Sequence, residues 1–221
     1  MSNQKVKLFD KKGITTWLIT LLAVGLFVVM FVNKKAGDFD FWYWMSANLV
    51  VVISLAFFTD RENLNLLKKD FNENLVKKIL LGLGFAFILF VVFYLGNIFI
   101  RLILEEAGEG IQNVYSFKQD APPWRIVLLM ALIIGPGEEI FWRGYLQRKL
   151  SQFFGENHGF IWATFLYTIV HVFTGNMVLV LAALICGIFW GFLYKKYRSL
   201  TINMVSHTVW DIVVFVIIPF H

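Results

Sequence analysis

The chain has 221 residues, of which 58% are hydrophobic and 16% are charged, and its formal net charge is +5. Its mean hydropathy of +0.68 lies far above that of an ordinary soluble domain, so lipid must be the solvent for most of the chain. The single cysteine, Cys186, excludes an intramolecular disulfide and a multi-thiolate metal site. The composition therefore predicts an all-α, multi-pass membrane protein.

Long apolar runs recur along the chain. A helix needs about 20 apolar residues to cross a hydrocarbon core of about 30 Å. We expect about seven spans, at residues 13–33, 41–59, 79–102, 124–147, 158–174, 177–194 and 200–218. The polar stretch 60–78 is expected to be a cytoplasmic connection or an interfacial helix. These runs predict one integrated polytopic transmembrane bundle, with a three-helix N-terminal region at 1–123 and a core at 124–218.

The lysines and arginines are unevenly distributed between the two ends of these spans. With a cytoplasmic N-terminus, fourteen lie inside: Lys5, Lys7, Lys11, Lys12, Arg61, Lys68, Lys69, Lys77, Lys78, Arg148, Lys149, Lys195, Lys196 and Arg198. Four lie outside, namely Lys34, Lys35, Lys118 and Arg125, while Arg101 and Arg143 fall within spans. Because cytoplasmic loops carry the excess of Lys and Arg, the sequence predicts an N-in, C-out topology. The basic charge then reflects membrane orientation, and no nucleic-acid partner is expected.

The fourth span carries three charged residues in the sequence GPGEEIFWRGY. Charged groups are costly at the centre of a span, so they are functional candidates by default. At about 100° per residue, Glu139 and Arg143 are nearly eclipsed and can form an ion pair, whereas Glu138 points about 140° away from Arg143. Pro136 is expected to bend the helix beside these carboxylates. The alternative is a single charge-neutralising cluster that locks helices together.

Two later spans carry histidines. His171 lies four residues after Tyr167 in the fifth span, and His207 lies four residues before Asp211 in the seventh, with Asn203 one turn earlier. Counted from the inner ends of their spans at about 1.5 Å per residue, the two histidines and Glu138 can meet in one layer. Such side chains also serve as simple interhelical hydrogen-bonding groups. The spacing therefore permits a shared site without proving it.

Three motifs now occur in order. EEIFWR at Glu138–Arg143 resembles the EExxxR motif of the CAAX prenyl protease and bacteriocin-processing (CPBP, or Abi) family of intramembrane peptidases. YTIVH at Tyr167–His171 resembles the family's FxxxH motif, with tyrosine in place of phenylalanine, and HTVWD at His207–Asp211 resembles HxxxN or HxxxD. The resemblance covers roughly residues 124–218 and does not extend to the first three spans.

The resemblance implies hydrolysis of a peptide bond in a prenylated or small hydrophobic, membrane-associated peptide or protein. By matching positions, Glu138 is the catalytic carboxylate, His171 helps it to activate water, and His207 and Asp211 act at the oxyanion. An ionised Asp211 accepts hydrogen bonds and cannot donate one, so it is better suited to orienting His207 unless burial keeps it protonated. Glu139 and Arg143 are expected to support the site, and Tyr167 mainly to pack.

The need for a metal ion is open. Glu138, His171 and His207 could serve as three ligands of a catalytic zinc ion, with water as the fourth. A buried carboxylate beside a histidine can also act as a general base without metal, with the oxyanion stabilised by preorganised donors. We favour the second alternative, so no cofactor is firmly expected.

Two other classes of function compete with the peptidase. A non-catalytic membrane scaffold or bacteriocin immunity protein would use the same polar cavity for binding. A proton-coupled transporter would use Glu and His as a proton relay, but the sequence lacks paired interrupted helices of the kind found in inverted repeats. Compact loops and the absence of organelle addresses favour a bacterial plasma membrane. The substrate cannot be read from the sequence.

Overall fold

A computed structural model describes residues 10–103, 106–118 and 121–220 of the chain. Lys5 and Lys7, which contributed to the predicted orientation, lie outside the described residues. The described part is helical, as predicted, and contains no named strand.

The described residues of the first half of the chain form five α-helices and a short 3-10 turn. They are α1 (Lys11–Asn33), α2 (Phe41–Thr59), α3 (Arg61–Asn72), α4 (Leu75–Ile103), α5 (Ala107–Tyr115) and the turn Ser116–Lys118. Side-chain oxygens of Asp10 and Asp40 accept hydrogen bonds from the first backbone N–H groups of α1 and α2. Such caps satisfy donors that have no partner inside the helix, which explains where these helices begin.

The second half begins with a continuous helical rod that changes its winding several times. Its segments are α6 (Pro123–Leu129), a π-helical segment (Met130–Ile134), α7 (Gly135–Glu138), a second π-helical segment (Glu139–Gln147) and α8 (Arg148–Phe154). The chain then forms α9 (Glu156–Val172), α10 (Met177–Tyr197), α11 (Leu200–Ile212) and a terminal π-helical segment (Val213–Ile217).

Five helical stretches of the described chain are long and apolar enough to cross a membrane. They are α1, α2, α4, α10 and the stretch Leu200–Ile217. The expected spans at 124–147 and 158–174 do not meet this criterion, because the rod is divided and carries Glu138, Glu139 and Arg143, and because α9 has 17 residues. The total of seven spans and the orientation therefore stay predictions.

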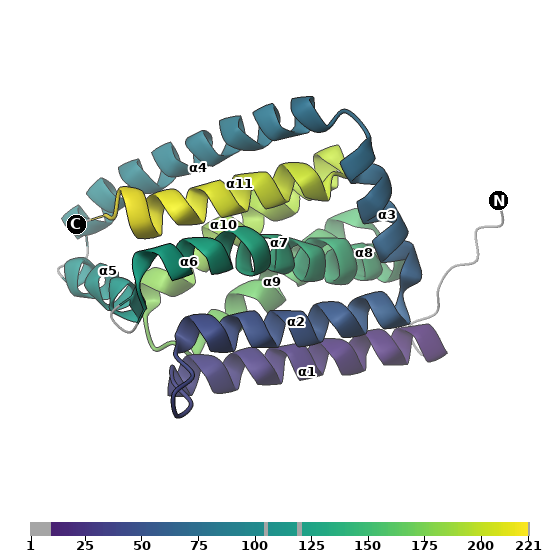
Figure 1. Cartoon of the computed structure of the whole chain (residues 1–221), viewed down its shortest axis with the longest axis horizontal. Helices are drawn as coiled ribbons and strands as arrows, with labels where there is room; N and C mark the ends of the chain where they lie inside the picture. Colours follow the sequence, from purple (N-terminus) through teal and green to yellow (C-terminus); the bar gives the residue numbers. More distant parts are fainter. Residues whose placement is uncertain (1–9, 104–105, 119–120, 221) are drawn as a thin grey trace.

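The helices run side by side, as Figure 1 shows. The α6–α8 rod lies between the α1–α2 pair and the α4–α11 pair, while α9 and α10 lie behind it. α4 packs mainly on α11, and α10 packs mainly on α9. α3 crosses one end of the bundle and α5 lies at the opposite end. The two ends of the bundle therefore differ in what closes them.

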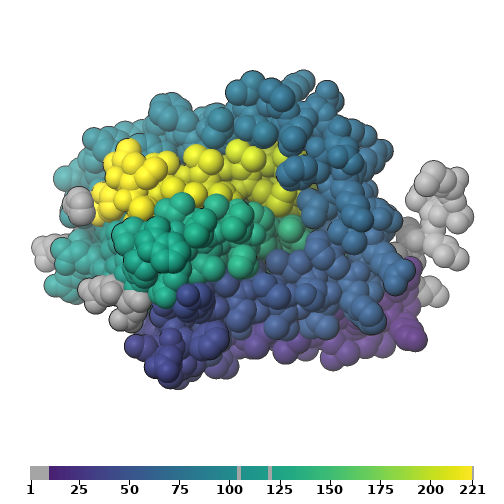
Figure 2. Space-filling view, in the orientation of Figure 1, coloured from purple at the N-terminus to yellow at the C-terminus, as the bar shows by residue number. Residues whose placement is uncertain are grey.

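Ion pairs and hydrogen bonds hold α3 against one end of the bundle. Figure 2 shows α3 covering that end. Asp60 pairs with Arg148 and with Lys149 (2.9 Å) at the start of α8. Asp70 accepts hydrogen bonds from Lys78 of α4 (2.7 Å) and from the backbone N–H of Thr201 in α11 (2.7 Å). Burial acts to raise the pKa of both aspartates, but these partners outweigh it and lower each pKa below its usual value.

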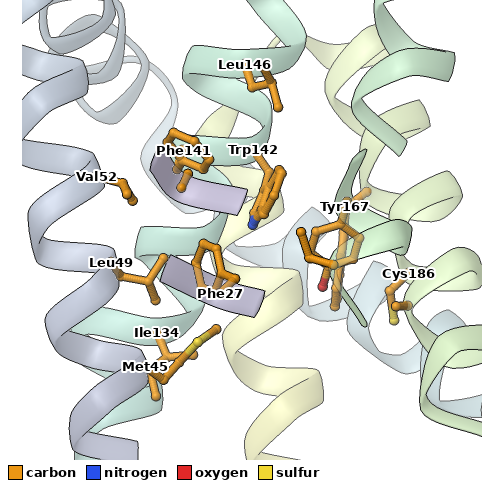
Figure 3. Packing of buried hydrophobic residues seen from close by; sticks show 14 of the residues in the cluster. Phe27, Met45, Leu49, Val52, Ile134, Phe141, Trp142, Leu146, Tyr167 and Cys186 are labelled. Atoms are coloured by element: carbon orange, nitrogen blue, oxygen red, sulfur yellow. The ribbon is translucent and has the colours of Figure 1, made fainter. Parts of the chain in front are cut away.

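Aromatic side chains fill the core between α1, α2 and the rod (Figure 3). Trp142 packs against Phe27 with ring centroids 5.8 Å apart, against Phe141 at 5.1 Å and edge-on against Tyr167 at 5.4 Å. Tilted and edge-to-face pairs at such distances are favourable beyond their buried area. This packing positions the residues that follow Glu138 on the rod.

Candidate active site

The rod approaches its neighbours closely where the EExxxR motif begins. A Cβ atom at Gly135 would lie 2.2 Å from the Thr208 hydroxyl oxygen of α11, and one at Gly137 would lie 2.9 Å from Ile53 of α2. A side chain at Gly135 would also meet the Thr208 Cα atom at 3.0 Å and would have to shift α11, whereas one at Gly137 would displace the end of the flexible Ile53 side chain. Pro136, between them, cannot donate a backbone hydrogen bond, and π-helical segments lie on both sides of this turn. π-Helical turns are uncommon and often occur at functional sites.

Glu139 is completely buried and has three partners. Its Oε1 accepts a hydrogen bond from Arg143 at 2.9 Å and lies 2.7 Å from His207 Nδ1, while its Oε2 accepts one from Asn203 Nδ2 at 2.9 Å. The predicted Glu139–Arg143 ion pair is thus confirmed. Glu139 also contacts the seventh expected span, so this carboxylate joins the rod to α11.

His207 is held on two sides. Its ring stacks on Trp190 of α10 with centroids 3.6 Å apart and planes 18° from parallel. A carboxylate paired with arginine accepts hydrogen bonds, so Nδ1–H donates to Glu139. Nε2 then faces Asp211 at 3.4 Å and Glu138 at 4.0 Å. The histidine is therefore oriented by Glu139 and Trp190, and its second nitrogen points towards two other carboxylates.

Glu138 differs from Glu139 in having a buried oxygen without a hydrogen-bond partner. Its side chain is buried, and its Oε2 has no such partner among the described residues. Tyr167 packs against Trp142 and lines the same cavity as Glu138. Buried polar atoms without partners are rare in folded proteins. Glu138 thus stays outside the Glu139–Arg143 pair, and its catalytic role stays a prediction.

His171 lines the same space as Glu138 but does not contact it. Its Nδ1 lies 2.8 Å from the Tyr167 carbonyl oxygen; because a carbonyl only accepts, Nδ1–H is the donor in this contact. The ring packs between Phe31 (centroids 4.9 Å) and Tyr167 (5.0 Å). Among the described residues, the histidine–carboxylate contacts within 4.0 Å all belong to His207. Nε2 of His171 is the nitrogen left for other partners.

A cavity of about 520 Å³ connects these groups. Its polar lining residues include Glu138, Tyr167, His171, His207 and Asp211, and most of its remaining walls are apolar side chains. Its volume falls within the range of about 300 to 1,000 Å³ that is usual for ligand pockets, which are mostly apolar with a few convergent polar groups. The four expected catalytic residues thus share one cavity.

The residues considered as zinc ligands do not assemble into a metal site. Within the described ranges, no group of three His, Cys, Asp or Glu side chains is arranged to hold a metal ion. Glu138 and His207 approach each other, but His171 stays outside that contact. The alternative of a zinc ion on Glu138, His171 and His207 therefore does not fit this geometry.

Two supporting residues were not predicted. Asn203 donates to Glu139 and also to the Trp190 carbonyl oxygen at 2.8 Å, and the Trp190 indole donates to Ser206 at 3.2 Å. The sequence shows Asn203 as a polar residue one turn before His207. That spacing does not predict its hydrogen-bond partners, which lie on other helices. Nothing in the sequence indicated a role for Trp190. The chain has eight tryptophans, and one that lies in an apolar span is expected simply to pack.

One comparison with known proteins matches the region of the chain that contains the three motifs. A family model described as type II CAAX prenyl endopeptidase Rce1-like matches residues 120–213, which is less than half of the chain. Searches of curated proteins and of solved structures each found no significant match. The matched segment contains all three motifs and every expected catalytic residue, and Rce1-like proteins are proteases. Residues 120–213 are therefore similar to the Rce1-like type II CAAX prenyl endopeptidases, which supports the resemblance of this region to the CAAX prenyl protease and bacteriocin-processing family.

Proposed function

We propose that this protein is an intramembrane endopeptidase that cleaves a membrane-associated peptide or protein, prenylated or otherwise small and hydrophobic, in a bacterial plasma membrane. The observation that carries the proposal is the contrast between adjacent glutamates. Glu139 is fully engaged, while Glu138 has a buried, unpartnered oxygen at an apolar cavity. A carboxylate of that kind is suited to bind and deprotonate water.

In the proposed reaction, Glu138 removes a proton from a water molecule whose oxygen attacks the scissile carbonyl carbon. The resulting oxyanion accepts a hydrogen bond from Nε2–H of His207, which needs the doubly protonated imidazole because Nδ1–H already donates to Glu139. The C–N bond then breaks as Glu138 returns its proton to the leaving amine. Bond cleavage thus consumes one water molecule and leaves Glu138 ionised again.

His171 and Asp211 act beside these two groups in the proposal. Nδ1–H of His171 donates to the Tyr167 carbonyl, so Nε2 accepts a hydrogen bond from the attacking water and helps to orient it. Asp211 lies 3.4 Å from Nε2 of His207, and its negative charge stabilises the imidazolium form that the oxyanion requires. Asp211 therefore orients His207 and does not itself donate to the oxyanion.

The test is cleavage of a quenched-fluorescent, farnesylated peptide and of an unprenylated hydrophobic peptide by the purified protein. Glu138→Gln keeps the shape of the side chain but removes the base, so we expect cleavage to fall by about 10²- to 10⁴-fold. The matched control is Glu73→Gln, at an exposed glutamate beyond α3, which should leave the rate unchanged. Equal rates for Glu138→Gln and the native protein would refute the catalytic role.

Loss of cleavage must be separated from loss of folding. Trp fluorescence and gel filtration in detergent should give the same profile for Glu138→Gln as for the native protein. If neither peptide is cleaved and a biological phenotype survives both Glu138→Gln and His171→Ala, the protein is a binding scaffold or immunity protein instead.

A further inference from the structure

The cavity extends from its polar groups towards one end of the bundle. Beyond its polar groups, its walls come from the second half of α4, from α5 and from the first half of α10, together with the end of α1, the start of α2, the rod before Glu138 and the last turns of the chain. These segments lie at the end of the molecule opposite α3 (Figure 1). The cavity therefore extends from Glu138 towards the α5 end.

Several of the wall residues are exposed, and they mark a mouth. On α4, Val92 and Phe99 are 42% and 64% exposed, and on α10, Leu181 and Ile185 are 37% and 40% exposed. α4 packs mainly on α11 and α10 packs mainly on α9, so these two faces are not buried against each other. The mouth therefore lies between α4 and α10, at lipid depth, with α5 beside it.

The opposite direction is closed by packed side chains. On the rod beyond Glu139, Phe141, Leu146 and Leu150 are completely buried, and none of residues 139–166 lines the cavity. Figure 3 shows Phe141 beside Trp142, with Leu146 farther along the rod. Farther on, Asp60 ties α3 to Arg148 and Lys149. A substrate from the α3 end would have to displace both the aromatic core and these ion pairs.

The basic residues indicate which end is cytoplasmic. Twelve lysines and arginines of the described chain lie at the α3 end: Lys11, Lys12, Arg61, Lys68, Lys69, Lys77, Lys78, Arg148, Lys149, Lys195, Lys196 and Arg198. The α5 end holds Lys34, Lys35, Lys118 and Arg125, with Arg101 near the end of α4. Under the positive-inside rule, the α3 end faces the cytoplasm and the mouth faces the other side.

We infer that the proposed peptidase takes its substrate from the non-cytoplasmic leaflet. Its substrate class is then a hydrophobic peptide segment of an exported or membrane-inserted protein, whose apolar part lies between α4 and α10 and whose scissile bond reaches Glu138. A prenylated C-terminus in the cytoplasmic leaflet is not its substrate. This inference rests on the proposed function for the cleavage step and on the charge distribution for the side.

The first experiment tests the side without any need for activity. In a Cys186→Ala background, Asn113→Cys places a thiol on an exposed position of α5, and Glu73→Cys places one on an exposed position at the α3 end. We expect a membrane-impermeant maleimide to label Asn113→Cys in intact bacterial cells, and Glu73→Cys only after permeabilisation. The reverse pattern would overturn the inference and leave the peptidase proposal intact.

The second experiment tests the route of the substrate. Right-side-out and inside-out membrane vesicles receive the same unprenylated, hydrophobic, quenched-fluorescent peptide, which carries a charged head group so that it does not cross the bilayer. We expect cleavage at least tenfold faster in right-side-out vesicles, and none in either preparation with Glu138→Gln. Faster cleavage in inside-out vesicles would overturn the inference alone. No cleavage in either preparation would overturn the proposed function and the substrate class, while the labelling pattern would still decide the side of the mouth.

Discussion

The α3 end of this bundle and the cavity near its other end differ in whether their acidic side chains have partners. At the α3 end, acidic side chains are paired: Asp60 with Arg148 and Lys149, and Asp70 with Lys78. Towards the α5 end, Glu138 lines a cavity with one buried oxygen unpartnered. Paired carboxylates therefore hold the α3 end together, whereas Glu138 faces the cavity with an oxygen that has no hydrogen-bond partner among the described residues.

The largest expected effect comes from breaking the buried pair beside the site. Arg143→Ala leaves Glu139 as a buried charge without its cation, so we expect a loss of about 3 to 5 kcal/mol in the free energy of unfolding. Glu138→Gln removes a charge with no such partner, and its effect should stay within about 1 kcal/mol. Chemical unfolding in detergent, followed by Trp fluorescence, measures both.

The exposed cation Arg61 supplies the control for that comparison. Arg61→Ala should change the free energy of unfolding by less than about 0.5 kcal/mol. If Arg143→Ala were as mild as Arg61→Ala, the buried ion pair would not be the element that stabilises this part of the rod.

A second comparison concerns stability: it sets a phenylalanine in the packed core of the rod against one at the mouth of the cavity. Phe141 is completely buried, and Phe99 is 64% exposed at the mouth. Phe141→Ala should lower the free energy of unfolding by about 3 to 5 kcal/mol because it leaves a cavity in a packed core. Phe99→Ala should cost less than about 0.5 kcal/mol, again by chemical unfolding in detergent. Equal losses would mean that both halves are packed alike.

The smallest effect concerns pH at the α3 end. The folded state lowers the pKa of Asp70 below 3.8, so its stabilisation is present above the unfolded pKa and is lost as the pH falls through the lowered, folded pKa. Asp70→Asn should cost about 1 to 2 kcal/mol at pH 7, through weakened hydrogen bonds to a charged group.

The readout is the unfolding temperature between about pH 6 and pH 2.5. The native curve should fall more steeply below about pH 4 than the Asp70→Asn curve. Asp38→Asn, at an exposed position between α1 and α2, should follow the native curve. Parallel curves for the native protein and Asp70→Asn would show that α3 is not held by this carboxylate.

Much of the site could be predicted from local spacing. Four residues along a helix bring Glu139 under Arg143 and His207 beside Asp211, because side chains at that spacing share a face. Both contacts are present. Partners on different helices were not accessible in this way: the contact of Glu139 with His207, the stacking of Trp190 on His207 and the distance of His171 from Glu138 all depend on how spans pack.

By itself, the sequence determined an all-helical membrane protein, the pairing within each helix and the family motifs, because apolar length and helical spacing are properties of consecutive residues. The tertiary structure decided that Glu139 contacts His207, that Trp190 stacks on the same histidine, and that Glu138, His171, His207 and Asp211 line one cavity. The reason is physical: membrane helices of similar composition can pack in many ways, and only close contacts such as Gly135 against Thr208 and ion pairs such as Asp60 with Arg148 select one of them.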